Sequence, residues 1–454
     1  MLFSCDEQTI IAQCTPQGSG AIALLRMSGI QAIAITQKMS VLASSKKLDS
    51  FATHTIHYGY ILDTDGSHID QVLFLLMHGP KTFTGQDTVE ITCHNNQFII
   101  EKIIRLAIGA GARLAQEGEF SKRAVLNGKI DILQAEAINE LIHAQTQLAL
   151  KKSLSQLEGS FSHWIASIEK ELLKGLALCQ ASFEFLDDEI EFAPQIKALL
   201  QSTHTMIAQV KKTFNQQQQI RQGIRIAIIG SVNAGKSSLF NALLNQERAI
   251  VTSIAGTTRD TIEAGVYTHN NFWTLIDTAG LRSTDDIIEQ EGIKRSMEQA
   301  HNADIILLVY ECARNLTREE EKVYEEIKSN YTHKIITVYN KSDRVMLPVA
   351  PHIAISSKTK HNIALLEQAI EEKITDLFAT IESPFLLNQR HYSLLLALEN
   401  KLHEMAPILN ASSVAYELLA IHLTDSIAQL AQLSGKEVSE TSMNLIFKEF
   451  CIGK

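Results

Sequence analysis

Paired cysteines are missing from this chain of 454 residues: its six cysteines are scattered, and no two have the CxxC spacing of a zinc ribbon or a redox pair. Isolated cysteines are typical of a reducing compartment. The chain also has no apolar run near the roughly 18 residues that a membrane-spanning helix needs. At the N-terminus, no basic stretch leads into an apolar one, as it would in a signal peptide. We therefore expect a cytoplasmic protein without stable membrane association.

Excess positive charge is missing too, because the formal net charge is -10 at pH 7. This balance argues against a protein coated with basic surface for nucleic acid, but it leaves room for a local basic patch or for a partner that does the binding. Hydrophobic residues make up 45% of the chain and charged residues 20%, a composition that supports large folded cores. The length suggests about three domains of roughly 150 residues.

Changes in residue pattern along the chain predict its domains. Residues 1–118 mix short alternating apolar runs with turns, which indicates an α+β domain. In residues 119–220, proline and glycine are scarce and apolar residues recur every three or four positions, as in long amphipathic helices. The polar tract 215–223 is interpreted as a linker. Strands and helices alternate over 221–378, which predicts a doubly wound α/β domain, and 379–454 is helical again.

The two helical stretches are expected to form one domain. Each has an apolar stripe that it cannot bury alone, such as the one along residues 165–179. The α/β segment would then be an insertion, which is tolerated where the ends of the host segments lie close together. The predicted architecture is therefore multidomain, with an α+β N-terminal domain, an all-α domain in two chain segments, and an inserted α/β domain.

The segment GSVNAGKS at residues 230–237 matches the phosphate-binding pattern G-x-x-x-x-G-K-S. It follows a predicted strand and opens a predicted helix, and this context distinguishes a phosphate loop from a chance match. Glycine lets backbone N–H groups approach phosphates, and the helix N-terminus adds positive potential. Lys236 would place its charge on the β- and γ-phosphates, and Ser237 would offer a hydroxyl to magnesium.

Four later motifs identify the nucleotide as GTP. Thr258 and Asp277 would help to hold magnesium, and Gly280 could donate its N–H to the γ-phosphate. Asp343, in the motif NKSD, can accept from both N1–H and the 2-amino group of guanine, whereas adenine would leave that carboxylate unpaired. The segment Ser356–Lys358 would add donors to guanine O6. The predicted GTP contacts are Asn233, Ala234, Gly235, Lys236, Ser237, Ser238, Thr252, Ser253, Ile254, Ala255, Gly256, Thr257, Thr258, Asp277, Thr278, Ala279, Gly280, Asn340, Lys341, Ser342, Asp343, Ser356, Ser357 and Lys358.

The catalytic machinery departs from that of many GTPases, in which a glutamine after the DTAG-type motif positions the attacking water. Leu281 occupies that position and cannot do so. Either hydrolysis is very slow or another group takes the role, and Glu289, Glu291 and Arg282 lie in the same segment. Each acid could equally lie on a solvated helix face. No obvious arginine finger is present, and the amide oxygen of Asn233 could instead coordinate a monovalent cation.

Taken together, the motifs resemble the MnmE (TrmE) family of tRNA-modification GTPases along essentially the whole chain. The matching segments are CTPQGSGAIALLRMSG, TFTGQDTVE, QEGEFSKRAVLNGKIDILQAEA, NAGKSSL, IAGTTRD, DTAGLR, NKSD and the closing FCIGK. The departures from the family pattern are small: Gln86 replaces glutamate, Gln116 and Glu117 open the third segment in place of arginine and proline, and Val125 replaces phenylalanine. We do not expect them to change the function.

The resemblance implies a folate-binding N-terminal domain that forms a constitutive homodimer, and a GTP-binding domain inserted into the helical domain. In a heterotetramer with a flavin-dependent partner of the MnmG (GidA) family, such proteins add an aminomethyl or carboxymethylaminomethyl group to carbon 5 of the wobble uridine of certain tRNAs. The one-carbon unit comes from 5-formyl- or methylene-tetrahydrofolate. The implied folate contacts are Arg26, Glu90, Lys129 and Lys454, although ordinary surface ion pairs would also account for these charges.

The resemblance also implies how GTP is hydrolysed. Potassium, held near Asn233 with help from Thr252, Ile254 and Thr257, stands in for the arginine finger. The cation would also favour dimerisation of the GTP-binding domains across the nucleotide. Glu289 matches the glutamate that orients the attacking water, so it is preferred over the neighbouring acid as the catalytic residue.

The final residues, CIGK, raise a separate question. Gly453 and Lys454 do not fit a prenylation signal, and Cys451 lacks companion ligands for a metal. Within the family the ending is a motif, and a helix that docks through Ile446 and Phe450 would deliver Lys454 to the folate. Cys451 would then be a catalytic thiol, acting as nucleophile or acid–base group near the one-carbon unit, or merely part of a tail that closes the pocket.

Two other classes of GTPase compete with this interpretation. A ribosome-assembly GTPase would be a binding switch without one-carbon chemistry, but such proteins usually carry an RNA-binding module with a GxxG loop and a basic surface. A dynamin-like GTPase of membranes would need an amphipathic basic or apolar insertion. The sequence offers neither feature. An assay of wobble-uridine modification in a deletion strain would separate all three classes.

Overall fold

The computed structural model divides the chain into two compact units. The first comprises Met1–Asn139, Leu157–Leu200 and Lys401–Lys454, and the second comprises Glu140–Gln156 and Gln201–Asn400. The structure describes residues 8–184, 192–244, 251–252, 262–268, 271–277, 296–344, 353–379, 383–437, 439–448 and 450–453. No helix within these ranges has both the length and the apolar character that crossing a membrane requires.

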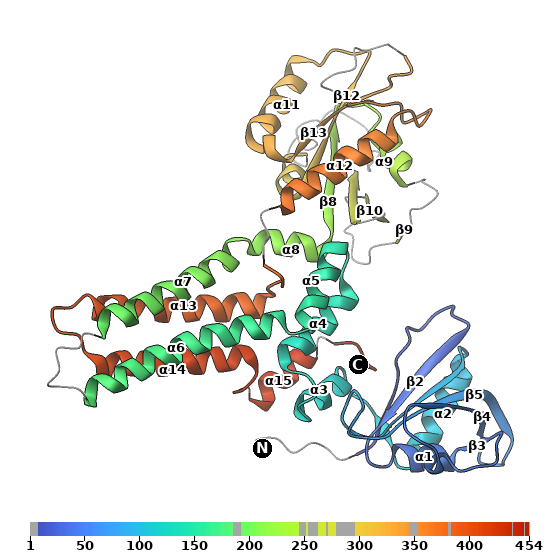
Figure 1. Ribbon diagram of the computed structural model, residues 1–454. Helices are drawn as coiled ribbons and strands as arrows, with labels where there is room; N and C mark the ends of the chain where they lie inside the picture. The colour runs from blue at the N-terminus through green and yellow to red at the C-terminus, as the bar shows by residue number, and fades with distance from the viewer. Residues whose placement is uncertain are drawn as a thin grey trace. The chain divides into compact units, whose positions relative to one another are not determined.

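A seven-stranded sheet forms the N-terminal part of the first unit (Figure 1). Its spatial order is β3-β4-β5-β6-β2-β1-β7, and neighbouring strands are antiparallel except for β1 and β7. The strands are β1 (Ile10–Gln13), β2 (Ile22–Ser28), β3 (Ser40–Leu42), β4 (Thr55–Leu62), β5 (His68–Met77), β6 (Thr88–His94) and β7 (Arg113–Leu114). Along β5, buried Val72, Phe74 and Leu76 alternate with more exposed residues, as in a sheet with one buried face.

Helices cover the buried face of this sheet. Residues of α1 (Ala32–Lys38) and α2 (Gln97–Gly109) form one hydrophobic core with the strands, in which Ile103 packs among residues such as Leu25 and Ile91. The sequence predicted this mixture of strands and helices, because short alternating apolar runs separated by turns are typical of half-buried strands.

Helices from both predicted helical stretches pack together in the first unit. The long helix α6 (Ser160–Glu184) lies along α14 (Tyr416–Ser434), and α3 (Glu119–Leu126) contacts α15 (Glu440–Phe447). Leu419, Leu423, Leu430 and Leu433 form the buried stripe of α14, and their spacing places them on one face of the helix. The helices that have residues in both units are α4 (Ile132–His143), α5 (Gln147–Leu157), α7 (Ala193–Lys212) and α13 (Gln389–Leu409).

A second seven-stranded sheet lies in the second unit, with the order β14-β13-β12-β8-β11-β10-β9. The five strands from β14 to β11 are parallel, and β10 and β9 complete one edge in antiparallel pairing. The strands are β8 (Ile224–Gly230), β9 (Val251–Thr252), β10 (Ile262–Tyr267), β11 (Phe272–Asp277), β12 (Ile305–Glu311), β13 (Ile335–Asn340) and β14 (Ile353–Ala354).

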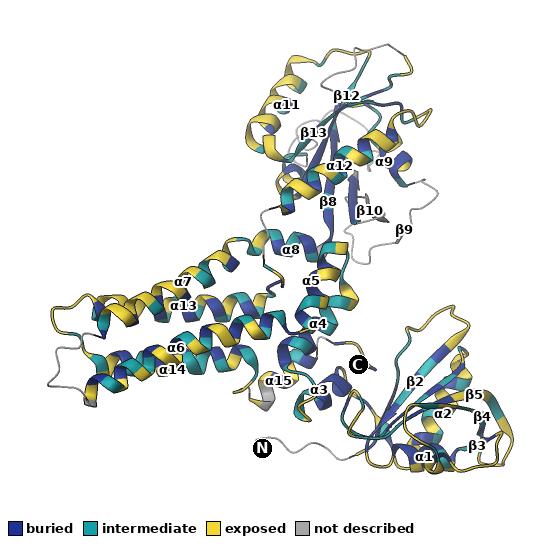
Figure 2. Cartoon of the chain, in the orientation of Figure 1, coloured by how far each residue is buried: buried dark blue, intermediate teal, exposed yellow. Residues whose placement is uncertain are grey.

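Helices lie on both faces of the second sheet, which confirms the predicted doubly wound α/β fold. Buried residues of α9 (Lys236–Leu244) and α12 (Ile363–Phe378) share one core with the strands, and α11 (Arg318–Tyr331) contributes to a separate core on the opposite face. The central strands β8 and β12 are buried almost continuously, as Figure 2 shows for β8. Central parallel strands covered on both faces have this pattern.

The polar tract 215–223 is not a linker, contrary to the sequence-based prediction. Residues Phe214–Gln222 form helix α8. Gln217 is fully buried, and its side-chain oxygen accepts a hydrogen bond of 2.6 Å from the backbone N–H of Leu387. Ile220 is also fully buried. The tract forms an ordered helix because its polar groups find buried partners elsewhere in the unit.

Candidate functional site

The phosphate motif has the backbone geometry that its sequence predicts. β8 ends at Gly230 and α9 begins at Lys236, so residues 231–235 form the loop between them. Gly235 has φ +91°, and an added Cβ would lie 2.3 Å from a neighbouring side-chain nitrogen, so only glycine fits there. Asn233 has φ 63°, a left-handed conformation that asparagine tolerates better than most residues.

The first turn of α9 carries the side chains expected to act on phosphates. The Nζ atom of Lys236 donates hydrogen bonds to the carbonyl oxygens of Gly230 at 2.8 Å and Ser231 at 2.9 Å, so the ammonium group lies against the loop. Ser237 and Ser238 are exposed at the helix N-terminus. Backbone N–H groups and the helix dipole make this end attractive to anions.

The sheet register positions two further predicted residues. Asp277 ends β11 and pairs in parallel register with Ile228 of β8, so its backbone lies at the same carboxyl edge as the phosphate loop. Thr252 ends β9, opposite Gly265 of β10. The predicted site residues outside the described ranges are Ser253, Ile254, Ala255, Gly256, Thr257, Thr258, Thr278, Ala279, Gly280, Glu289 and Lys454.

Asn340 links the phosphate loop to the loop that follows β14. It is 1% exposed, and its Nδ2 donates to the carbonyl oxygens of Ala234 at 3.0 Å and Gly235 at 3.3 Å. Its Oδ1 accepts from the backbone N–H of Ser357 at 3.1 Å and from the hydroxyl of the same residue at 3.0 Å. The motif predicted Asn340 at the nucleotide but gave no sign of this connecting role.

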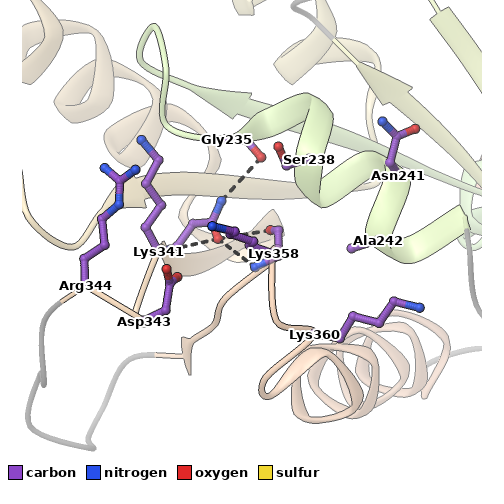
Figure 3. A pocket seen from close by; sticks show the side chains of 11 residues that line it. Gly235, Ser238, Asn241, Ala242, Lys341, Asp343, Arg344, Lys358 and Lys360 are labelled. Carbon is purple, nitrogen blue, oxygen red and sulfur yellow. Dashed lines mark hydrogen bonds between the residues drawn. The ribbon is translucent and has the colours of Figure 1, made fainter.

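A pocket of about 470 Å³ lies beside the phosphate loop, within the size range of small-molecule sites (Figure 3). Figure 3 shows Lys341 and Asp343 next to each other, with Gly235 and Ser238 on the facing segment. A 2.7 Å hydrogen bond from the Ser356 hydroxyl lowers the pKa of Asp343. The lining residues are Gly235, Ser238, Asn241, Ala242, Asn340, Lys341, Asp343, Arg344, Ser357, Lys358 and Lys360.

Positive charge dominates the rim of this pocket. Lys341, Arg344, Lys358 and Lys360 all line it, against the single acid Asp343 among the lining residues. The carboxylate of Glu311, at the end of β12, pairs with the Nζ of Lys341 at 2.8 Å. The pocket therefore combines a carboxylate, Asp343, that can accept hydrogen bonds from a nucleobase with positively charged side chains that can attract an anion.

A contact that the motifs did not reveal comes from α11. Tyr324 is 4% exposed, and burial raises its pKa to about 12. Its hydroxyl accepts a hydrogen bond from the backbone N–H of Ser231 at 2.7 Å and donates one to the carbonyl of Val309 at 2.8 Å. From the sequence, a tyrosine on the apolar face of a helix is expected to be an ordinary core residue. The sequence pattern therefore does not predict its hydrogen bond to the phosphate loop.

Two of the residues implied for folate meet in the first unit. Arg26 on β2 and Glu90 on β6 are opposite each other in the antiparallel register. The Nε of Arg26 donates to Oε1 of Glu90 at 2.8 Å, and their side chains are 22% and 14% exposed. The guanidinium carbon lies 5.6 Å from the ring centroid of Phe120 and 5.8 Å from that of Phe83. The pair is thus shielded and flanked by aromatic rings, unlike the exposed pairs that contribute little.

Lys129 lies near the same part of the unit. It is exposed, and a Cβ added to Gly85 would lie 3.1 Å from Lys129 Cε, so the lysine stem runs beside the turn at 82–87. Phe83, which flanks Arg26, belongs to that turn. The side-chain amide of Asn127 donates to the carbonyl of Thr84 at 2.6 Å and fastens the turn to the segment that carries the lysine.

A buried ion cluster around Glu119 contacts this turn through Gln86. Glu119 accepts hydrogen bonds from Arg113 at 2.8 Å and Arg123 at 2.9 Å, and the Nη1 of Arg123 donates to the side-chain oxygen of Gln86 at 2.9 Å. Burial by itself would raise the pKa of Glu119, but the hydrogen bonds from Arg113, the Gln116 N–H and Arg123 outweigh it and lower the pKa. Gln86, one of the departures from the family pattern, is therefore a neutral partner of this cluster.

The C-terminal residues lie against the end of β1. The thiol of Cys14 donates to the carbonyl of Gly453 at 3.1 Å. Gly453 has φ +95°, and an added Cβ would lie 2.6 Å from the carbonyl oxygen of Gln13. Only glycine can therefore occupy this position of the C-terminal tail. Cys451 is exposed. Phe450 is buried and Ile446 packs against the same cluster, as the sequence predicted, but the preceding helix α15 ends at Phe447, so Phe450 lies beyond it.

Comparison with known proteins finds matches along nearly the whole chain. Residues 9–129 match a family model described as the GTP-binding protein TrmE N-terminus, and residues 132–451 match one described as the MnmE helical domain. The chain is 37% identical to a tRNA modification GTPase MnmE from Bacillus cytotoxicus, over 98% of this chain and 99% of the relative. It is 38% identical to that of Enterococcus faecalis, over 98% of each. A solved structure of Era from Aquifex aeolicus is 23% identical with a TM-score of 0.27, covering 39% of this chain and 66% of that one.

Proposed function

The chain belongs to the MnmE family of tRNA modification GTPases, and from this premise we propose that it is a potassium-dependent GTPase acting with an MnmG-type flavoprotein. Together they would add a carboxymethylaminomethyl or aminomethyl group to carbon 5 of the tRNA wobble uridine, using the one-carbon unit of a tetrahydrofolate. The observation that carries the proposal is that residues implied for folate, Arg26 and Glu90, form one shielded pair, in a chain that also has a GTP site.

The residues of the GTP site can contact the phosphates, the magnesium ion and the base of the nucleotide. Lys236 lies against the loop and can meet the β- and γ-phosphates. Ser237 is exposed at the start of α9, which suits a magnesium ligand, and Thr258 would complete the pair. The carboxylate of Asp343, which accepts a hydrogen bond from Ser356, can accept from both guanine donors. Magnesium would neutralise the charge of the phosphates when bound.

Potassium is proposed to take the place of an arginine finger. Asn233 is exposed within the phosphate loop, and its amide oxygen is a hard ligand of the kind such a cation prefers. Thr252, Ile254 and Thr257 are proposed as its further ligands. We propose that Glu289 orients the attacking water, since Leu281 cannot.

The shielded pair of the first unit suits a folate. The Arg26 side chain orients Glu90, whose carboxylate can accept from the amino–imino edge of a pterin. The rings of Phe83 and Phe120 offer apolar surface beside it. The cations of Lys129 and Lys454 would meet the carboxylates of the glutamate tail. The exposed thiol of Cys451, whose tail is anchored through Gly453, is proposed to act on the one-carbon unit.

The proposal includes an organisation of the chain. Residues 1–118 would be the folate-binding and dimerisation domain, 221–378 the GTP-binding domain, and 119–220 with 379–454 one helical domain. Packing of α6 against α14 supports an insertion, because these helices lie on either side of the GTP-binding segment in the sequence. The active species would be a cytoplasmic heterotetramer of two copies of this chain and two of the flavoprotein.

A reconstituted reaction tests the proposed function. The purified chain and its flavoprotein partner are incubated with tetrahydrofolate donor, flavin, GTP, potassium and tRNA from a deletion strain, and the nucleosides are analysed by mass spectrometry. We expect modified uridine from the unaltered chain, none from Glu90→Gln with GTP hydrolysis preserved, and normal product from the matched control Glu101→Gln on an exposed helix face. Hydrolysis without any modified uridine would favour the alternative, a ribosome-assembly GTPase.

A further inference from the structure

The phosphate loop leaves the sheet at a point where one backbone hydrogen bond is replaced by a side chain. The parallel ladder between β8 and β12 ends with the pair Gly230 and Val309. Beyond it, the Ser231 N–H and the Val309 carbonyl are bridged by the hydroxyl of Tyr324, which accepts from the first and donates to the second. The hydroxyl therefore takes the place of the next hydrogen bond between β8 and β12, at the point where the chain leaves β8 and enters the phosphate loop.

The space around this bridge is closed. A Cβ added to Gly230 would lie 2.7 Å from the carbonyl oxygen of Val309 and 3.3 Å from the Tyr324 hydroxyl. Ser231 is 9% exposed and Tyr324 4%. Water has little access to either backbone group, so a lost hydroxyl would leave a buried donor and a buried acceptor without partners. Such unpaired groups cost more than the original hydrogen bond contributes.

A residue that this helix holds makes a second contact with the loop. The Nη1 of Arg314, just before α11, donates to the carbonyl of Val232 at 3.1 Å. The carboxylate of Glu320 holds this guanidinium through two hydrogen bonds of 3.0 and 3.1 Å and also accepts from the backbone N–H of Thr317, in a capping box at the start of α11. Two successive loop residues are thus connected to α11: 231 directly through Tyr324, and 232 through Arg314, which Glu320 holds.

We propose that Tyr324 is a positioning residue for GTP binding, which fixes the first residues of the phosphate loop so that its N–H groups face the phosphates. It acts through Ser231 rather than on the nucleotide, and Arg314 supplies a weaker, exposed contact of the same kind. Backbone donors that are already oriented bind an anion without a further ordering cost. Losing the bridge lets the Ser231 peptide rotate, so phosphate affinity falls while recognition of the base does not.

The test compares Tyr324→Phe with Tyr310→Phe. Tyr310 packs against the Tyr324 ring with centroids 4.7 Å apart, and none of the contacts described for it joins its hydroxyl to the phosphate loop. Affinities for GTP and GDP are measured with fluorescent nucleotide analogues, together with the preference for GTP over XTP and the melting temperature. In Tyr324→Phe, the dissociation constants for GTP and GDP should rise about tenfold, because binding must restore the loop arrangement in which the Ser231 N–H, one of the two unpaired groups, is buried without a partner. The preference for guanine should not change.

The control variant should stay within twofold of the unaltered chain. A dissociation constant within twofold for Tyr324→Phe would overturn the proposal, and so would an equal loss in both variants, since a general packing effect would explain it. Should Tyr324→Phe not fold, Arg314→Leu removes the contact with the Val232 carbonyl together with the exposed ion pair to Glu320. It should weaken GTP binding two- to threefold, and unchanged affinity would again overturn the proposal. GTP binding by the unaltered chain is measured in parallel. If the unaltered chain did not bind GTP, the proposed GTP site itself would be wrong, whereas normal binding means that the result for the variants tests the role of Tyr324.

Discussion

Replacing Glu119 by glutamine should destabilise the region around α3 by about 3 kcal/mol, because it leaves a buried guanidinium without its counter-ion. The side chains of Glu119 and Arg123 are only 8% and 3% exposed, and their N–O distance is 2.9 Å. Breaking a pair so deeply buried typically costs about 3–5 kcal/mol. The lower end applies here, since Arg123 keeps two neutral partners, the Gln86 side chain and the carbonyl of Gln8.

Hydrogen–deuterium exchange measures this loss locally, without requiring the whole chain to unfold in one step. A drop of about 3 kcal/mol in the opening free energy of α3 corresponds to roughly hundredfold faster exchange of its amides. The matched control is Glu101→Gln, whose partner Arg105 is 3.4 Å away in an exposed pair; it should change exchange less than threefold. If Glu119→Gln exchanged no faster than this control, the buried pair would have no stabilising role.

The same pair predicts a direction for pH dependence. Hydrogen bonds from Arg113, Gln116 and Arg123 lower the pKa of Glu119 despite its burial. A carboxyl group with a lowered pKa in the folded state stabilises the fold above its unfolded pKa, near 4.3, and this contribution disappears as the pH falls through the folded pKa. The stability difference between the unaltered chain and Glu119→Gln should therefore be constant from about pH 8 to pH 5 and shrink below about pH 4. A difference that grew on acidification would contradict this assignment.

The remaining predictions concern the two sites. Replacing potassium by sodium should slow GTP hydrolysis sharply, and Asn233→Ala should remove the difference between the two salts; equal rates in the unaltered chain would exclude the cation model. Asp343→Asn should lower the preference for GTP over XTP, because one acceptor becomes a donor, and unchanged discrimination in a competition assay would mean that the base is recognised elsewhere. Cys451→Ser should abolish uridine modification in the reconstituted reaction but spare folate binding and GTP hydrolysis. A normal rate of modification would leave the thiol without a chemical role.

Sequence patterns were sufficient to predict the structure where the function of a motif requires one particular backbone conformation. The motif at 230–237 requires a turn that admits N–H groups, and a strand before and a helix after it are the context in which that turn forms. The structure accordingly ends β8 at Gly230 and begins α9 at Lys236. In the same way, regular apolar spacing predicted a buried stripe along residues 165–179, and Ile165, Ile168 and Leu172 of α6 are buried.

Contacts between distant parts of the chain could not be predicted in this way. The polar tract 215–223 forms a helix because Leu387, 170 positions away from Gln217, supplies a buried partner for its side chain. The thiol of Cys14 meets the carbonyl of Gly453 across 439 positions. The periodicity of apolar residues and the composition describe how one segment behaves alone. A buried polar residue is favourable only when the tertiary structure provides a hydrogen-bond partner, which these local patterns do not reveal.

The role of Asn340 illustrates why the nucleotide site works as a unit. Its amide joins the carbonyl oxygens of Ala234 and Gly235, at the end of the phosphate loop, to Ser357 in the segment proposed to recognise the base. Tyr324 holds the start of the same loop through Ser231. A loop fixed at both ends presents its N–H groups in one arrangement before any phosphate arrives, so its ordering is completed by folding rather than by binding. On the proposed assignment, recognition of guanine and of phosphate would share one side chain, and a nucleotide that displaced Ser357 would also disturb the carbonyls that Asn340 holds.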